Sequence, residues 1–344
     1  MSVLSLVRDN IKNITPYSSA RDEFTDFDTE MVFLDANENP FETNVNRYPD
    51  PQQQSVKQLL SKQKNISTEH ILLGNGSDEV LDLLFRAFCE PNKDNIITLP
   101  PTYGMYSVLA NINAVATKEV TLTSDFQPAV VQILAQADAN SKLLFLCSPN
   151  NPTGNNFNAF EVENLLNSFE GIVVIDEAYI DFSETKSWLD RLEEFPNLVI
   201  TQTLSKAYGM AGIRLGVCYA SAEIISVLNK IKPPYNVNQL TQSSAIERLT
   251  NYDKVLQEIA LIKKERQLLI NSLLQIDYIT TIYPSDANFV LIKVDDATKR
   301  YNQLIEKGIV IRNRTSQLLC DNCLRVTVGT KEENNKLIDV LKTL

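Results

Sequence analysis

Short apolar runs alternate with amphipathic stretches through the first two thirds of the chain. The runs that read as strands end near Gly74, Pro100, Val120, Pro149, Asp176, Thr203 and Ser221. Helical stretches separate most of them, which predicts an α/β fold with a mostly parallel seven-stranded sheet and crossover helices. The last run follows its predecessor too closely for a crossover helix, so we expect that strand to be antiparallel.

The pattern changes at residues 231–239, IKPPYNVNQ, where two prolines interrupt it. A long helical pattern then runs from about residue 239 to 274, with an expected kink near Asn251. We therefore expect a large domain over residues 29–235 and a smaller α/β domain over residues 236–344. Apolar runs predict the strands of the smaller domain at 289–292, 310–312 and 324–328.

The first residues read as an amphipathic arm. Val3, Leu4, Val7 and Ile11 recur at helical spacing, without the apolar core of a signal peptide. We expect residues 1–28 to form this arm and to pack with the smaller domain.

Composition and charge narrow the classes of function. The 344 residues are 44% hydrophobic and 22% charged, which is ordinary for a globular protein. A net charge of −11 argues against nucleic-acid and anionic-membrane partners, and no apolar run approaches the ~20 residues of a spanning helix. We expect a cytoplasmic enzyme that acts on small molecules. An anionic substrate would need a locally basic pocket.

The cysteines favour neither a disulfide framework nor a metal centre. They number five, an odd count, and they are scattered. Cys320 and Cys323 spell C-x-x-C, but no second pair accompanies them, and the single His70 leaves too few ligands for a closed zinc site. We expect a hairpin turn at Asp321–Asn322 and no bound metal.

The candidate chemistry centres on Lys206, which follows the apolar run 198–203 in TQTLSKAYGMAGIRLG. Desolvation at the end of a buried strand lowers the pKa of a lysine and makes its amine nucleophilic enough to form a Schiff base. Ser205 and Arg214 are groups that hold an anion such as a phosphate. Pyridoxal 5′-phosphate (PLP), with its aldehyde and its phosphate, would use all of them. Taken alone, the same residues also fit a solvated loop.

Two other apolar runs end in polar residues suited to the ring of PLP. Asp176 follows the run 171–175, where a carboxylate can keep a pyridine nitrogen protonated, and Tyr179 can reach the phenolic oxygen. Asn151, in SPNNPTG, can donate to the same oxygen. Taken singly, Asp176 also fits a helix cap and Asn151 a plain turn.

The strand-to-helix turn after residue 73 carries Gly74, Gly76, Ser77 and Asp78. Glycines at such a turn let backbone N–H groups and the helix dipole approach a phosphate. The third glycine of a dinucleotide fingerprint is missing, so we reject a nicotinamide cofactor.

Together these blocks resemble the histidinol-phosphate aminotransferase family, a branch of the fold-type I, PLP-dependent class II aminotransferases. The resemblance spans nearly the whole chain in the family's order. The lysine block and IDEAY are specific for the superfamily, whereas LDANENP, RYPDP and GNGSDE narrow it to this branch. The matching blocks are TPY (15–17), LDANENP (34–40), RYPDP (47–51), GNGSDE (74–79), PPTYGMY (100–106), SPNNPTG (148–154), VIDEAYIDF (174–182), TLSKAYGMAGIRLG (203–216), DANFVLIK (286–293), GIVIRNR (308–314) and LRVTVGT (324–330).

The resemblance implies a role for each matching residue near the cofactor. Lys206 would bind PLP covalently and shuttle a proton, and Asp176 would pair with the ring nitrogen. Asn151 and Tyr179 would bind the phenolic oxygen, while Tyr103 would stack on the ring face. The phosphate would be held by Gly76, Ser77, Thr203, Ser205 and Arg214, and Asp78 would also belong to the cofactor site.

The same resemblance suggests the substrate side. Arg325 matches the carboxylate-binding arginine of the superfamily, and Arg312 matches a second arginine of this branch. Arg314 alternates with Arg312 on one face of a strand, and we expect it to be a solvated edge charge. Tyr17 would form part of a lid, and Asn288 would lie near the substrate.

The implied reaction is transamination between histidinol phosphate and 2-oxoglutarate, which gives imidazole acetol phosphate and glutamate in histidine biosynthesis. Tyr48 would reach the phosphate of a neighbouring subunit, which implies a homodimer with shared sites.

An aromatic or broad-range aminotransferase and a threonine-phosphate decarboxylase share the same pattern, and they stay open as alternatives. A transcription regulator with this fold would need a basic helix-turn-helix segment, for which the chain has neither the length nor the charge.

Overall fold

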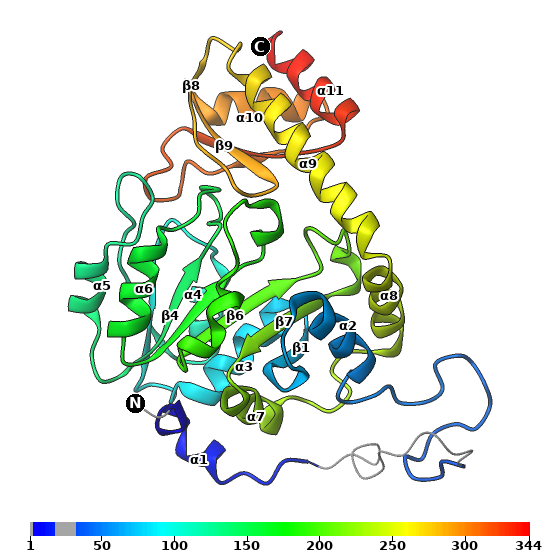
Figure 1. Ribbon diagram of the computed structural model, residues 1–344. Coiled ribbons are helices and arrows are strands. Elements are labelled where there is room, and N and C mark those ends of the chain that lie inside the picture. The colour runs from blue at the N-terminus through cyan, green and yellow to red at the C-terminus, as the bar shows by residue number, and fades with distance from the viewer. Residues whose placement is uncertain (1–2, 18–31) are drawn as a thin grey trace.

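The computed structural model describes residues 3–17 and 32–344, which form a large and a small α/β domain (Figure 1). The large domain contains a seven-stranded sheet in the order β1-β7-β6-β5-β4-β2-β3. Strands β2 to β6 pair in parallel, whereas β7 is antiparallel to both β6 and β1. The mostly parallel sheet and its antiparallel last strand are therefore confirmed. The strands are β1 (Ile71–Asn75), β2 (Asn95–Thr98), β3 (Ala116–Glu119), β4 (Ser141–Cys147), β5 (Ile172–Asp176), β6 (Leu198–Thr203) and β7 (Leu215–Ala220).

Helices cover both faces of this sheet. In β5, Val173 and Ile175 face one core cluster, while Ile172 and Val174 face the other. Burial on both faces explains why the strands read as continuous apolar runs. The first cluster includes residues of α2 (Gln54–Lys64), α5 (Val130–Gln136) and α6 (Ala159–Ser168), and the second includes residues of α3 (Ser77–Phe88), α4 (Met105–Ile112) and α7 (Ala222–Ile231).

The small domain contains a four-stranded antiparallel sheet in the order β10-β11-β9-β8. Sequence analysis missed β8, because exposed Thr280 and Thr281 interrupt its apolar pattern. It also placed β10 too early, since Val310 is exposed outside the strand. The elements are β8 (Ile279–Ile282), β9 (Phe289–Val294), α10 (Ala297–Glu306), β10 (Arg312–Asn313), β11 (Cys323–Thr327) and α11 (Lys331–Leu341).

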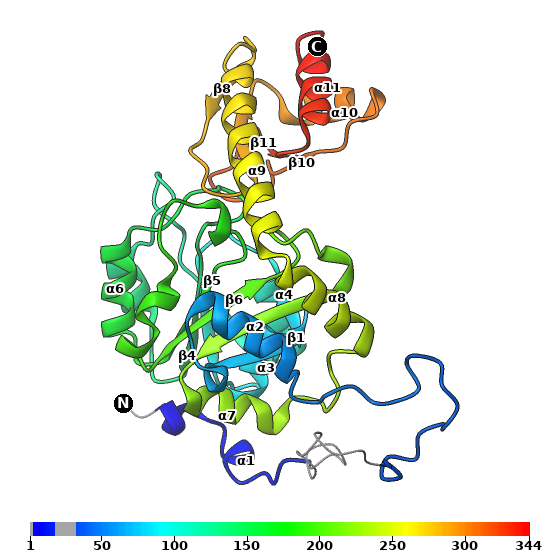
Figure 2. The same cartoon turned by 45° about the vertical axis from the view of Figure 1, so that its right-hand side comes forward.

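Two consecutive helices connect the domains. Helices α8 (Gln239–Thr250) and α9 (Tyr252–Leu273) are separated at Asn251, where the kink was expected. Helix α8 packs against α2 of the large domain. Ile259 of α9 belongs to the large-domain core and Leu269 to the small-domain core. The boundary between the two cores therefore lies within α9, which spans both domains in Figure 2. The expected boundary was at residue 236.

The described part of the N-terminal arm contacts the large domain. Val3, Val7 and Ile11, from η1 (Val3–Leu6) through α1 (Asp9–Lys12), are buried in one cluster with residues of α3 and α7. The small domain lies at the opposite end of the molecule (Figure 1), so this packing differs from the expected one. An amphipathic arm needs only an apolar surface, and α3 and α7 provide it. Residues 18–28 of the expected arm lie outside the described residues.

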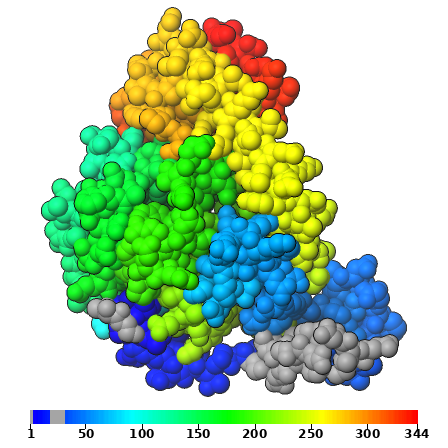
Figure 3. All heavy atoms as spheres, in the orientation of Figure 1, coloured from blue at the N-terminus to red at the C-terminus, as the bar shows by residue number. Residues whose placement is uncertain are grey.

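The small domain rests on the edge of the large domain (Figure 3). One backbone contact between them is the hydrogen bond from Asp286 N to Gly154 O, at 2.7 Å. In the small domain, Cys323 N donates to Cys320 O at 3.0 Å, which makes a turn at Asp321–Asn322. That turn closes the loop 314–322 and does not join two strands directly. Among the described helices, none combines the length and apolar character needed to cross a membrane.

Candidate active site

The carboxyl ends of β4, β5 and β6 meet the turn between β1 and α3 around a cavity of about 210 Å³. Parallel strands end at the same edge of a sheet, so the chain places polar residues from distant segments together there. Cys147, Ala178 and Ala211 also line the cavity. The predicted site residues that line it are Ser77, Asp78, Tyr103, Asn151, Asp176, Tyr179, Thr203, Ser205, Lys206 and Arg214.

Lys206 lies just beyond β6, with its Nζ 5.7 Å from the ring centroid of Tyr179. Burial lowers the pKa of Lys206, and the positive charge of Arg325 lowers it further, against the opposing charge of Asp176. A lowered pKa increases the fraction of neutral amine at neutral pH, and the neutral amine is the nucleophile. The arrangement suits a lysine that reacts with a carbonyl.

Asp176 ends β5 and is buried, with 4% of its surface exposed. Its Oδ2 accepts a hydrogen bond from the Tyr106 hydroxyl at 2.8 Å, and its Oδ1 accepts one from Ala178 N at 3.2 Å. Burial raises the pKa of Asp176, while these hydrogen bonds oppose the rise. A buried carboxylate at this edge fits a ring nitrogen that carries a proton, because each charge stabilises the other.

Tyr106 is a site residue that sequence analysis missed. It lies in the first turn of α4, is fully buried, and stacks on Phe145 with ring centroids 4.6 Å apart. The signal was present in PPTYGMY, where Tyr106 follows Tyr103 by one helical turn. The sequence alone did not single it out, because only the fold brings β5 beside it.

The turn before α3 forms a cradle for an anion. Gly76 has a φ of 82°, and a Cβ there would lie 2.7 Å from Nη2 of Arg214. Arg214 Nη1 lies 3.5 Å from the Ser205 hydroxyl oxygen. Ser77 begins α3, so its N–H lies among the unpaired donors of a helix N-terminus. The missing Cβ at Gly76, the guanidinium of Arg214 and these N–H donors fit the phosphate of PLP.

Asp78 and Tyr103 are paired at the rim of this cradle. The Tyr103 hydroxyl donates to Asp78 Oδ1 at 3.1 Å, and Arg214 Nη2 lies 3.8 Å from Asp78 Oδ2. Burial and the Asp78 charge raise the pKa of Tyr103. A carboxylate repels a phosphate, so the contacts of Asp78 suit it to orienting Tyr103 and Arg214.

Arg325 enters the site from β11 of the small domain. Its Nη1 donates to Oδ1 of Asn151, and its guanidinium carbon lies 5.0 Å from the ring centroid of Phe289. Burial, followed by the charge of Arg314, lowers the pKa of Arg325 to about 10. Because Oδ1 of Asn151 accepts this bond, its Nδ2 is left to donate elsewhere.

Arg314 differs from its expected state. It is half-buried, and burial, followed by the charge of Arg312, lowers its pKa. The expectation of a solvated edge charge is therefore wrong, because its Nε is buried. Arg312 itself is exposed and lies opposite Arg325 in the β10–β11 register.

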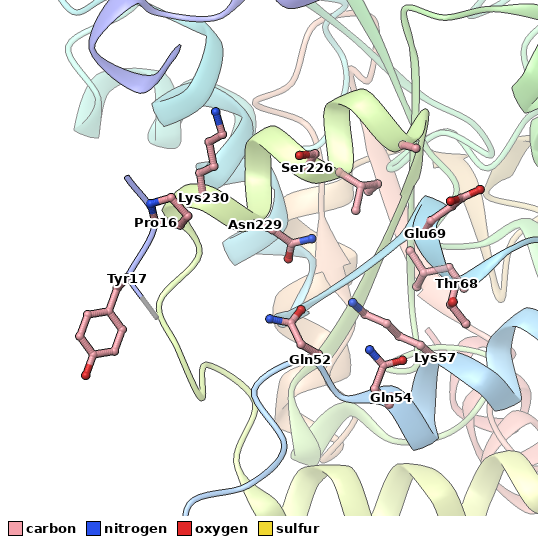
Figure 4. Close-up of a pocket in the computed structure, with 13 residues that line it drawn as sticks. Pro16, Tyr17, Gln52, Gln54, Lys57, Thr68, Glu69, Ser226, Asn229 and Lys230 are labelled. Carbon is pink, nitrogen blue, oxygen red and sulfur yellow. The ribbon is translucent and has the colours of Figure 1, made fainter. Parts of the chain in front are cut away.

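Six predicted residues do not line the cavity in this single chain: Gly76, Arg312 and Arg325, described above, and Tyr17, Tyr48 and Asn288. Tyr17 is 73% exposed and lines a separate cavity, where its ring points away from Lys57 (Figure 4). Tyr48 is 51% exposed and stacks on Tyr235 with ring centroids 4.5 Å apart. The backbone of Asn288 accepts a hydrogen bond from Val328 N, and the residue does not line the cavity.

Comparisons with known proteins show the family. A model of the family "Aminotransferase class I and II" matches residues 26–341. Histidinol-phosphate aminotransferase from Flavobacterium johnsoniae is 68% identical over 341 residues, which cover 99% of this chain and 98% of the relative.

Solved structures share the fold. Histidinol-phosphate aminotransferase from Clostridium acetobutylicum is 25% identical with a TM-score of 0.80, covering 87% of this chain and 91% of the other. The enzyme from Sinorhizobium meliloti, solved with pyridoxal 5′-phosphate, is 22% identical with a TM-score of 0.80, covering 87% and 83%. The chain therefore belongs to the histidinol-phosphate aminotransferase family, within the class I and II aminotransferases.

Proposed function

We propose that this protein transfers an amino group from histidinol phosphate to 2-oxoglutarate, giving imidazole acetol phosphate and glutamate in histidine biosynthesis. The observation that carries the proposal is the position of Lys206. Its amine, with a lowered pKa, shares one cavity with buried Asp176 and with Ser77 and Arg214 of the anion cradle. The 68% identity to a relative named for this reaction supports the choice of substrate.

PLP, when bound, supplies an electron sink for the bonds at the amino-acid carbon. Lys206 would hold the cofactor covalently, and its Nζ would carry a proton between the substrate carbon and the cofactor. Asp176 would pair with the ring nitrogen and keep it protonated, while Asn151 and Tyr179 would donate to the phenolic oxygen. Tyr103 would cover one face of the ring. The cofactor phosphate would be bound by Gly76, Ser77, Thr203, Ser205 and Arg214, with Asp78 orienting its neighbours.

Arg325 and Arg312 bind the anionic group that both amino donors carry. The phosphate of histidinol phosphate and the side-chain carboxylate of glutamate are both suited to a guanidinium fork. Arg325 reaches the large domain through Asn151, which places its guanidinium beside the cavity. Asn288, next to Phe289 in β9, contributes to the same end of the pocket.

The active unit is a homodimer with shared sites. Tyr48 and Tyr17 are both exposed and both lie outside the cavity of their own chain, so they are available to a partner subunit. Tyr48 completes the partner's phosphate site and Tyr17 the lid. The enzyme acts in the cytoplasm, a reducing compartment that suits the free thiols of its five buried cysteines.

The test is a panel of amino donors assayed with the purified enzyme. Histidinol phosphate should give a kcat/KM at least a hundredfold above that of phenylalanine or tyrosine, and threonine phosphate should release no carbon dioxide. Equal use of phenylalanine would favour an aromatic aminotransferase. Carbon dioxide from threonine phosphate would favour the decarboxylase.

A further inference from the structure

Three arginines share the face of the small sheet that is turned away from its helices. Leu324 of β11 packs into the small-domain core, so the next residue, Arg325, lies on the opposite face. Arg312 is directly opposite Arg325 in the antiparallel register, which puts both side chains on that face. Arg314 N donates to Cys323 O at 2.8 Å, which continues the pairing beyond β10 and gives Arg314 the same orientation.

These guanidinium groups lack nearby carboxylates, and two of them have a nitrogen without a hydrogen-bond acceptor. The Nε atoms of Arg314 and Arg325 are buried without a hydrogen-bond partner among the described residues. Within residues 3–17 and 32–344, no carboxylate oxygen lies within 4.0 Å of a side-chain nitrogen of Arg312, Arg314 or Arg325. Buried donors without acceptors are costly, and neighbouring like charges add repulsion. An anion that enters between the arginines removes both penalties.

The charge of that anion decides how many arginines it needs. A carboxylate has one negative charge and two oxygens, which a single guanidinium fork can satisfy. A phosphate monoester carries a charge near −2 at neutral pH and offers three acceptor oxygens. A third guanidinium therefore adds much to phosphate binding and little to carboxylate binding.

We propose that Arg314 is a specificity-determining residue that binds the phosphate of the amino donor together with Arg312 and Arg325. The proposal rests on the proposed function and goes beyond it, because it assigns the preference for a dianionic donor to one residue. Arg314 contributes its unpaired Nε and the neighbouring guanidinium nitrogens as donors. Burial raises the pKa of Tyr179 in the large domain, and the charges of Arg325 and Arg314 oppose that rise.

The test uses Arg314→Gln and Arg314→Lys in the holoenzyme, with Arg86→Gln on the exposed surface of α3 as the matched control. For Arg314→Gln we expect kcat/KM for histidinol phosphate to fall roughly ten- to a hundredfold, mainly through KM, from the loss of a charge-assisted contact. The glutamate half-reaction should change by less than about threefold, because a single fork still binds its carboxylate. Arg314→Lys should recover part of the loss, and Arg86→Gln should match the wild type.

Inorganic phosphate provides a readout that does not depend on the amino donor. As a competitive inhibitor of the glutamate half-reaction, it should bind about tenfold more weakly to Arg314→Gln. The difference should grow as pH rises, because a larger share of the phosphate is then the dianion. Equal losses for histidinol phosphate and glutamate, or unchanged inhibition by phosphate, would overturn the role of Arg314. A different outcome would separate the two proposals. If the wild type does not use histidinol phosphate, but phosphate inhibits the wild type and no longer inhibits Arg314→Gln, the proposed function is refuted and the anion site stands.

Discussion

Arg325 of the small domain donates a hydrogen bond through Nη1 to Oδ1 of Asn151, beyond the end of β4 in the large domain. The residue proposed to bind the substrate anion therefore also holds a residue proposed to face the cofactor ring. The contact crosses the boundary between the two cores, so the position of the small domain and the alignment of Asn151 depend on one another.

The pKa of Arg325, lowered to about 10, predicts a pH limit on substrate capture. A lowered pKa in a cation means that its charge is lost as pH rises through that value. We expect kcat/KM for histidinol phosphate to decline above about pH 10, whereas kcat declines less because a bound anion raises the pKa again. Profiles measured from about pH 9 to 11 check this. Arg325→Gln should have a low kcat/KM for histidinol phosphate at every pH and should not show the decline above about pH 10. A wild-type kcat/KM that stays constant over this range would contradict the assignment.

Gly76 predicts a defect confined to cofactor binding. In Gly76→Ala, the new Cβ would lie 2.7 Å from Arg214 Nη2 at a φ of 82°. The strained φ alone costs roughly 1–3 kcal/mol, and moving Arg214 opens the phosphate cradle, so the dissociation constant for PLP should rise at least about tenfold. Equilibrium dialysis measures that constant.

Two glycines serve as controls for this variant. In Gly308→Ala the new Cβ would have no atom within 4 Å, but the residue keeps a φ of 76°, so this variant adds backbone strain without a clash. Gly104→Ala meets nothing within 4 Å and has a φ of −69°. Both should bind PLP as the wild type does. Normal PLP affinity in Gly76→Ala would show that Arg214 does not form the cradle.

Tyr106 predicts a change in the pH dependence of cofactor binding. Its hydroxyl is the largest contribution that opposes the burial-driven rise in the pKa of Asp176. In Tyr106→Phe that pKa should rise further, so Asp176 loses its charge at a higher pH as the solution is acidified. PLP should then dissociate at a higher pH than from the wild type, and its binding at neutral pH should weaken about tenfold.

The control for Tyr106→Phe is Tyr278→Phe, which removes a 2.7 Å hydrogen bond to Leu341 O in the small domain. It should lower stability by about 1 kcal/mol and leave the pH profile of PLP binding unchanged. If both variants shift that profile alike, Tyr106 acts through general stability and is not a positioning residue for Asp176.

Shared sites predict complementation between two defective variants. Co-expression of differently tagged Tyr48→Phe and Lys206→Ala chains should give hybrid dimers with one site in which both residues are intact. Random pairing restores about a quarter of the wild-type number of sites in the whole mixture. The doubly tag-purified hybrid has one intact site of two, so its activity should be about half that of the wild type. A hybrid without restored activity, or a fully active monomer in sedimentation, argues against shared sites.

The fold was largely predictable because its strands are buried on both faces and end in polar residues. The short loop after Lys206 predicted the antiparallel β7, and the motifs after β4, β5 and β6 predicted residues that now line one cavity. The local sequence pattern did not predict the role of residues whose surroundings come from distant segments of the chain. Tyr106 was not singled out because β5 is remote in sequence. Arg314 was expected to be solvated because the burial of its Nε depends on the folded chain and not on its neighbours in sequence.

Borohydride reduction followed by peptide mapping tests the central claim most directly. In the resting holoenzyme the pyridoxyl group should be fixed on Lys206, and Lys206→Ala should retain the fold but lose turnover. After addition of histidinol phosphate without 2-oxoglutarate, the amino group moves to the cofactor, the link to Lys206 is broken, and reduction should label no lysine. Labelling of another lysine, or labelling of Lys206 that histidinol phosphate leaves unchanged, would contradict the account.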